Sequence, residues 1–397
     1  MKAKLNSICI YNQGKGRKVR RDNIQNLPMP NYLCLSIDGL QHGMIGAFGN
    51  TWIQTPTLDA LACQSALFDR FYAASLDLST TLNELWQFPT DYHKTLLTDD
   101  ASVFLHEHAG RFDAKHRLEA KSRKYPVRKI EGTQFYHNIA TLADLLQQRT
   151  DEPFVFWAHF KGFRGPWDFP ISYRQRYQVD EDPDPYSGIA LPDIAGKNID
   201  PDVRQAVAEA YSGGVSVLDD TLSGLLAFLQ EEGLDRNTVL LLMSVRGFSL
   251  GEHRYIGANE DLYGENVHLP LFIRFPDGFH SGFRSQALLQ PGDVWKLLTN
   301  DILPSEPDEF HAAIHIAGGV TVMPDWFVYR KSSGTELYVK PDDRWEVNDV
   351  AGRCPHVLED LERISNCTGQ NHRHPGASRD LGIACDVGSS GFRLSSE

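Results

Sequence analysis

Residues 32–39, Tyr-Leu-Cys-Leu-Ser-Ile-Asp-Gly, contain the pattern that decides the fold. A short apolar run is closed here by an Asp-Gly pair. Such a run is typical of a strand buried inside a parallel sheet, with a loop at its carboxyl end. Further apolar runs follow along the chain. The segments between them, residues 57–67, 141–147 and 203–232, carry apolar residues at helical spacing.

The other expected strands have the same apolar character and cover residues 94–99, 153–158, 238–244 and 269–275. Strands that alternate with helices favour an α/β fold, in which a mostly parallel sheet is sandwiched between helices. After residue 306 the pattern changes to short alternating segments. These predict a small antiparallel sheet and a last helix, at residues 320–323, 326–329, 336–339 and 357–364.

Residues 171–200 are rich in Pro, Asp, Tyr and Gly and contain no clear element. We expect a long surface loop over one end of the sheet, either a functional loop or a plain insertion. The whole chain divides into four expected parts. These are a flexible basic N-terminal tail at 1–29, an α/β domain at 30–305, a small C-terminal α+β subdomain at 306–365 and a disordered tail at 366–397.

The composition excludes several classes of protein. Hydrophobic residues make up 41% of the 397 residues, yet no run approaches the roughly 18 apolar residues of a membrane span. Acidic residues exceed basic ones by 52 − 39 = 13, so nucleic acid is not an expected partner. Six scattered cysteines argue against a disulfide framework. No apolar stretch follows the basic N-terminal residues, which favours a cytoplasmic location, and Met29 is a second possible start.

Ligands of open α/β sheets bind beyond the carboxyl ends of the strands. The residues in these places are Asp38, residues 159–166 and residues 244–247. We therefore expect the functional site to be built from these three segments.

The motifs in and around these segments resemble those of the sulfatase family, which belongs to the alkaline phosphatase superfamily. They follow one another in the family's order from about residue 30 to residue 365. The matching segments are 30–39, 46–50, 55–61, 68–73, 159–167, 237–253, 263–270 and 336–348. The resemblance implies an alkaline phosphatase-like fold and the activity of a sulfuric ester hydrolase.

The resemblance also implies a divalent cation held by several carboxylates, and a formylglycine nucleophile made from the Cys or Ser of a Cys/Ser-x-Pro-x-Arg motif. This sequence departs from that pattern at each point. The aligned residues are Gly39 for a second carboxylate, Leu-Ser-Thr-Thr-Leu at 78–82 for the nucleophile motif, Val245 and Arg246 for metal ligands, Arg164 for a substrate-binding His and Ala258 for a Lys.

A hard cation such as Ca²⁺ or Mg²⁺ prefers about six oxygen ligands, so Asp38 alone is a poor metal site. Arg246 is a fixed cation that cannot ligate a metal. We expect its guanidinium to lie beside Asp38 and to supply the positive charge instead. The alternative is that Asp38 only caps the turn after its strand.

Two further pairs have a functional and a structural interpretation. Arg164 and Arg246 together could bind sulfate, phosphate or carboxylate, or each could pair with a local acid. His253 could contact a substrate or anion and His159 lies at a strand end within the site. The favoured interpretation of both histidines is structural hydrogen bonding.

Ser79, Thr80 and Thr81 are candidates for an unmodified nucleophile. Phosphodiesterases of the superfamily resemble this chain in having a single Asp-Gly after the first strand, but they need two metals. Val245 and Arg246 argue against that chemistry. We favour helix capping before Asn83 as the role of Ser79–Thr81.

Three functions remain. The favoured one is that of a non-catalytic, sulfatase-like pseudoenzyme, which either binds a small anionic ligand or serves as a regulatory protein. The second is an active sulfuric ester or phosphoester hydrolase with a rearranged site near Asp38, with Ca²⁺ or Mg²⁺. Its catalytic candidates are Ser79, Thr80, His159, Arg164 and His253. The third is a structural protein that docks to a protein partner such as an active paralogue.

Overall fold

The computed structural model describes residues 29–121, 123–299, 303–306 and 309–359. Nearly all of the expected N-terminal tail, the tail at 366–397 and the second half of the helix expected at 357–364 lie outside these residues. Contacts divide the chain after Asp349. In the second unit, the described residues form a turn followed by helical residues 355–359. All elements named below belong to the first unit.

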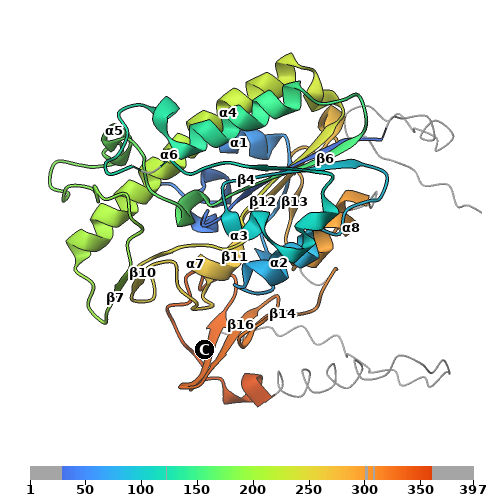
Figure 1. Ribbon diagram of the computed structural model, residues 1–397. Helices are drawn as coiled ribbons and strands as arrows, with labels where there is room; N and C mark the ends of the chain where they lie inside the picture. The colour runs from blue at the N-terminus through green and yellow to red at the C-terminus, as the bar shows by residue number, and fades with distance from the viewer. Residues whose placement is uncertain (1–28, 122, 300–302, 307–308, 360–397) are drawn as a thin grey trace, which may run out of the picture. The chain divides into compact units, whose positions relative to one another are not determined.

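A central sheet of eight strands confirms the expected α/β fold (Figure 1). Only β12 runs antiparallel to its neighbours, so the sheet is mostly parallel. The strands lie in the order β13 (Arg284–Ser285), β2 (Ala66–Phe68), β12 (Leu271–Arg274), β8 (Thr238–Met243), β1 (Asn31–Ile37), β6 (Phe154–Phe160), β4 (His93–Thr98) and β5 (Ala114–Arg117).

Strand β1 lies in the middle of the sheet and is buried on both faces. Leu35 is opposite Leu242 of β8 and Ala158 of β6. Because side chains alternate along a strand, Leu33 and Leu35 point into one hydrophobic cluster, whereas Cys34 points into the other. Burial on both faces explains why the decisive run is continuously apolar rather than alternating.

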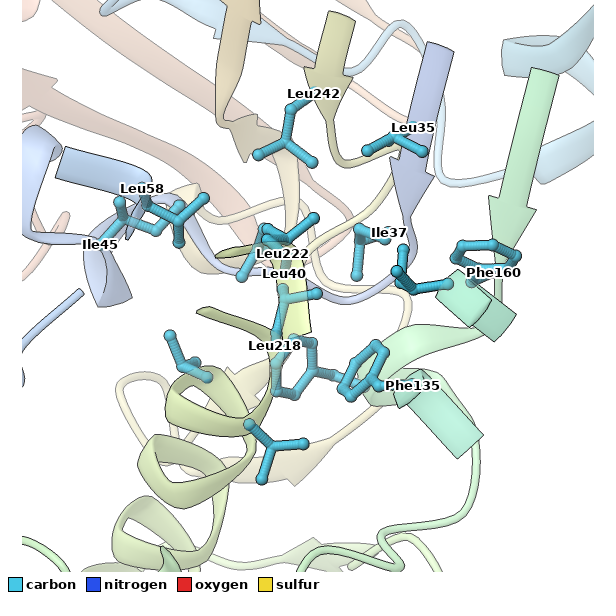
Figure 2. Packing of buried hydrophobic residues seen from close by; sticks show 14 of the residues in the cluster. Leu35, Ile37, Leu40, Ile45, Leu58, Phe135, Phe160, Leu218, Leu222 and Leu242 are labelled. Atoms are coloured by element: carbon cyan, nitrogen blue, oxygen red, sulfur yellow. The ribbon is translucent and has the colours of Figure 1, made fainter. Parts of the chain in front are cut away.

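Helices cover both faces of the sheet (Figure 1). The first cluster is covered by α1 (Pro56–Cys63), α4 (Gln134–Gln147) and α6 (Pro201–Glu231). The second is covered by α2 (Leu78–Leu85), α3 (Ala101–Phe104) and α8 (Val294–Thr299). Figure 2 shows Leu218 and Leu222 of α6 beneath Leu35 and Leu242 of the sheet. Truncating one such leucine to alanine costs about 2–5 kcal/mol.

The small antiparallel sheet is also confirmed. Its strands are β14 (Ile314–Ile316), β15 (Val320–Val322), β16 (Trp326–Lys331) and β17 (Gly334–Val339). Two minor sheets complete the strands of the described residues: β3 (Phe71–Tyr72) with β11 (His268–Leu269), and β7 (Ile194–Ala195) with β10 (Tyr255–Gly257) and β9 (Ser249–Leu250). The short helix α7 (Gly264–Val267) precedes β11. Within the described residues, no helix combines the length and apolar character needed to cross a bilayer.

Several expected elements differ from the structure. The strand expected at 269–275 is divided between β11 and β12, which belong to different sheets. The helix expected at 57–67 ends at Cys63, because Ala66–Phe68 instead pairs with β12 and β13. The segment 171–200 contains α5 (Ile171–Arg174) and β7 rather than loop alone. It is ordered by the buried guanidinium of Arg174, which donates to the carbonyl oxygens of Phe169 at 3.1 Å and Gly188 at 3.0 Å.

Candidate functional site

The loops that follow β1, β8 and β6 meet around Asp38. The backbone N–H of Gly39 donates to Arg246 O at 2.8 Å, and that of Phe163 donates to Asp38 O at 2.8 Å. Gly39 has a φ of +78°, and a Cβ there would lie 3.0 Å from the Cβ of Phe163. A glycine is therefore needed at this crossing of the loops. The three segments expected to form the site do come together.

The Asp38 carboxylate is held by Arg246 in a two-point contact. The Nε of Arg246 donates to Oδ1 at 3.3 Å, and its Nη2 donates to Oδ2. The Nε of Arg164 lies 3.7 Å from the same Oδ1. Asp38 is 1% exposed and the side chain of Arg246 is 18% exposed, so the carboxylate is shielded from water. The guanidinium of Arg246 thus lies beside Asp38, where the sequence places it.

The two arginines respond differently to this one carboxylate. Burial alone lowers the pKa of Arg246, but the charge and hydrogen bonds of Asp38 outweigh it and raise the pKa above its ordinary value. Burial lowers the pKa of Arg164 to about 10, and the more distant Asp38 only partly offsets it. Arg164 instead donates from Nε to Gly247 O at 3.1 Å. Both groups remain cations near neutral pH.

The acidic side chains that follow β4 accept hydrogen bonds from other groups of the protein. Asp99 accepts from Lys161 N at 2.8 Å and from Asn138 Nδ2 at 2.8 Å. Asp100 caps α3 by accepting from Ser102 N at 2.7 Å. Within the described residues, no group of three or more His, Cys, Asp or Glu side chains is arranged to hold a metal ion. The donor set around Asp38 therefore does not fit Ca²⁺ or Mg²⁺.

His159 is fully buried at the end of β6. Its Nδ1 lies 3.1 Å from Ser36 Oγ, and its Nε2 has no hydrogen-bond partner among the described residues. Burial lowers its pKa to about 4, although Asp38 and Asp100 act in the opposite direction. The imidazole is therefore neutral near pH 7.

His253 uses both ring nitrogens within the protein. Nδ1 lies 2.9 Å from Glu265 Oε1, and Nε2 lies 2.9 Å from the backbone oxygen of Glu346. Its ring stacks on Tyr263 with centroids 3.4 Å apart. Burial lowers the pKa of His253, but the hydrogen bond and charge of Glu265 outweigh it and raise the pKa. Both nitrogens are thus engaged by Glu265 and Glu346 of the protein itself, which leaves neither of them for an anionic ligand.

Ser79, Thr80 and Thr81 lie in the first turn of α2, not at its cap. The cap is Asp77, which accepts from Thr80 N at 2.9 Å and Thr80 Oγ1 at 2.6 Å. The capping role expected for Ser79–Thr81 is therefore wrong. Asp is among the residues preferred at an N-cap, so Asp77, directly before the helical run, is a signal that could have located it.

Ser79 is paired with a histidine from the segment after α3. Its Oγ lies 2.8 Å from His106 Nε2, and His106 Nδ1 accepts the N–H of His108 at 3.1 Å. An acceptor Nδ1 places the proton of a neutral imidazole on Nε2. His106 then donates to Ser79 and cannot take its proton, so the pair lacks the arrangement of a nucleophile and its base.

A basic pocket of about 600 Å³ opens on one side of Arg164. Its charged lining consists of Arg123, Lys124, Lys161 and Arg164. The motifs did not indicate this pocket, but the composition contains a signal: residues 115–129 hold seven Lys or Arg and one Glu. A run of this sign stands out in a chain with a net charge of −13.

The family model described as Sulfatase matches residues 98–296. The chain belongs to the sulfatase family. Two curated relatives of this sulfatase-family chain come from Bacteroides thetaiotaomicron. An N-acetylglucosamine-6-O-sulfatase is 31% identical over 96 residues, which are 24% of this chain and 17% of the relative. An N-acetylgalactosamine-6-O-sulfatase is 39% identical over 62 residues, 16% of this chain and 12% of the relative. The matches thus span less than a fifth of either relative.

Solved structures match a much larger part of this sulfatase-family chain. A phosphonate monoester hydrolase of Agrobacterium radiobacter superposes with a TM-score of 0.66 at 16% identity, over 87% of this chain and 96% of that one. A protein solved in complex with its substrate D-glucosamine-2-N,6-O-disulfate gives a TM-score of 0.68 at 15% identity, over 87% and 98% of the two chains. Likeness at such low identity concerns the fold alone, and it confirms the expected alkaline phosphatase-like fold.

Proposed function

We propose that this chain is a sulfatase-like protein with degenerate nucleophile and metal sites. It does not catalyse ester hydrolysis and acts instead as an anion-binding or regulatory protein. The two-point contact of Arg246 with Asp38 carries this proposal. A guanidinium neutralises the carboxylate from inside the protein and cannot polarise a substrate oxygen as a divalent cation does.

The nucleophile position supports the same function. Residues 78–82 contain no Cys, Pro or Arg. The hydroxyl of Ser79, the serine of this segment, lies beside a histidine that donates to it. An unactivated serine hydroxyl is a weak nucleophile at neutral pH. On this proposal the chain keeps the family's fold and lacks the nucleophile and the metal ligands that the resemblance implies.

Anion binding is supported by the basic pocket beside Arg164. Its four cationic side chains face a space of about 600 Å³, and no acidic side chain lines it within the described residues. Arginine and lysine at this density favour sulfate, phosphate or carboxylate groups.

The catalytic part of the proposal is tested by metal analysis and turnover. We expect protein purified without chelator to contain less than one equivalent of Ca²⁺ or Mg²⁺, as measured by elemental mass spectrometry. Turnover of 4-nitrophenyl sulfate and bis(4-nitrophenyl) phosphate is expected to equal the buffer blank. Stoichiometric metal, or turnover that Asp38→Ala abolishes, would show that the chain is a hydrolase with a rearranged site.

The binding part is tested by titrating inorganic sulfate into the protein in a calorimeter. Arg164→Gln is expected to weaken binding by about tenfold, the value of one charge-assisted hydrogen bond. Lys197→Gln is the matched control, because this exposed residue does not line the pocket. Equal affinities of the two variants would exclude the pocket as the anion site.

A further inference from the structure

A second basic pocket adjoins the one beside Arg164. It has a volume of about 740 Å³ and is lined by residues 123–129, 131 and 132. Arg123 and Lys124 line both pockets. The two spaces are therefore neighbours that share one wall, with Lys161 and Arg164 on one side and Arg128 and Lys129 on the other.

Two of the six cations of the two pockets have an acidic partner in the protein: Arg123 pairs with Asp168, and Arg164 lies near Asp38. The charge of Lys161 also acts on Asp99 and Asp100, without a direct contact. The side chains of Lys124, Arg128, Lys129 and Lys161 form no hydrogen bond or ion pair with any described residue. Glu131 is the single acidic side chain that the two described linings contain. Like charges gathered at this density repel one another, and a bound anion relieves that repulsion.

The shared wall is fixed to the fold, so the pockets are built rather than formed by a loose loop. Arg123 Nη2 donates to Gly132 O, and its Nε lies 3.4 Å from Asp168 Oδ2. Val127 N donates to Asp168 O at 2.9 Å, and Asp168 Oδ2 also accepts from Gln134 N. Asp168 is 3% exposed and therefore acts as a buried anchor for this wall.

We propose that the two pockets form one bipartite site for a small ligand that carries two or more tetrahedral oxyanion groups. One sulfate or phosphate lies against Lys161 and Arg164, and another lies against Arg128 and Lys129. The inference rests on the proposed function, which assigns anion binding to the first pocket alone. Tyr125 is 79% exposed in the second pocket and offers an aromatic surface to the part of the ligand that joins the anionic groups.

Calorimetric titration with three probes tests the bipartite site. Inorganic sulfate carries one group, whereas tripolyphosphate and a disulfated disaccharide each carry several. At least one of the two larger probes is expected to bind more than about tenfold more tightly than sulfate, because its second group binds at a high effective concentration. The tighter of the two identifies condensed phosphate or sulfated sugar as the source. Added salt is expected to lower the affinity for both larger probes.

Variants assign each half of the site. The double variant Arg128→Gln/Lys129→Gln is expected to lower the affinity for the larger probe about tenfold and to leave the affinity for sulfate unchanged. Lys161→Gln is expected to lower the affinity for the larger probe and for sulfate, whereas Lys197→Gln is expected to change neither affinity. These side chains have exposed or half-exposed positions, so unchanged circular dichroism will show that the variants fold.

Two outcomes would overturn the inference, and they differ from failure of the proposed function. One is equal affinity for sulfate and both larger probes. The other is a larger probe that binds tightly but does not respond to Arg128→Gln/Lys129→Gln. In either case sulfate binding that depends on Arg164 leaves the proposed function intact. Absence of binding by all three probes rejects both.

Discussion

Asp38 is a charged residue that is almost completely buried, and its environment dictates the chemistry of the site. An unpaired carboxylate at this depth would be strongly unfavourable. Arg246 lies against both of its oxygens, and Arg164 adds a second positive charge at 3.7 Å. Asp38, Arg164 and Arg246 together carry one net positive charge, and the charges of Asp77 and Asp100 also act on Arg246.

Removing Arg246 leaves Asp38 without its main partner. We expect Arg246→Met to lower the free energy of unfolding by about 3–5 kcal/mol, because an uncompensated charge stays buried. The double variant Asp38→Asn/Arg246→Met is expected to recover a large part of this loss. Urea denaturation at pH 7 measures both. A loss below about 1 kcal/mol in the single variant would mean that the pair contributes little to stability.

His159 and His253 are expected to give stability opposite dependences on pH. The folded pKa of His159 is about 4, below its ordinary value of 6.5, so the unfolded chain takes up the proton first. Stability is therefore lost as the pH falls from 6.5 towards 4, by about 3 kcal/mol in total. We expect His159→Gln to flatten this part of the profile, measured by urea denaturation between pH 7 and pH 4.5.

The sign is reversed for His253, whose folded pKa is raised. Its stabilising contribution is fully present below the unfolded pKa and is lost as the pH rises through the folded value. His253→Gln is therefore expected to cost more stability at pH 6 than at pH 8. A profile that neither variant changes would show that other groups determine the pH dependence.

The sequence could locate Asp38 and Arg246, because Asp38 directly follows one apolar strand and Arg246 lies three residues after the end of another, and strand ends meet at one edge of the sheet. It could not locate the basic pocket. Lys124 and Lys161 are far apart in the chain and meet only because Asp168 anchors the wall that contains Arg123. It also could not show that His253 bonds to the backbone of Glu346, since no local pattern encodes a contact over 93 positions.

Helix α2 illustrates how an element near the site is held in place. Its N-terminal N–H groups need a partner, and the carboxylate of Asp77 supplies one. The hydrogen bonds from Thr80 lower the pKa of Asp77, and the charge of Arg246 adds to the effect. Helix α2, which the sequence resemblance aligns with the family's nucleophile motif, therefore begins with a negative charge that acts on Arg246.

We expect Asp77→Ala to lower the free energy of unfolding by about 1 kcal/mol, because the helix loses its cap. Asp77→Asn keeps the acceptor oxygen and is expected to cost much less. Guanidinium denaturation of the two variants beside the parent protein provides the measurement. Equal losses for Ala and Asn would mean that the charge of Asp77 matters more than its hydrogen bond.

The long strands of the central sheet could be predicted, and its two shortest strands could not. Strands β1, β6 and β8 are six or seven residues long and apolar enough to be found from composition alone. Strands β2 and β13 have three and two residues, and they exist because β12 offers an edge for β2, which in turn pairs with β13. Such pairing depends on the completed sheet rather than on local preference.

At the scale of the whole first unit, the small antiparallel sheet shares its core with the central sheet. Phe327 and Tyr338 belong to the same hydrophobic cluster as Leu269 and Leu271. Glu336 of β17 reinforces this contact, since it accepts from Tyr263 at 2.8 Å. The two sheets are therefore expected to fold together.

Native-state hydrogen exchange can test this expectation. The most protected amides of β16 and β12 are expected to exchange with the same free energy of opening, because one cooperative event exposes both. Glu336→Ala is expected to lower both values together by about 1–3 kcal/mol, since Tyr263 and Lys331 lose a charged partner. A lower value confined to β16 would show that the small sheet opens by itself.

Because Arg246 neutralises Asp38, the stability of the loops around these two residues is also expected not to depend on a metal ion from the surrounding solution. A loop that needs a bound ion is only as stable as the local supply of that ion allows. Here the counter-charge is encoded in the chain and is present as soon as the loops after β1 and β8 have formed. Chelators such as EDTA are expected to leave the melting temperature unchanged, and the fold can then persist in places where free calcium is scarce.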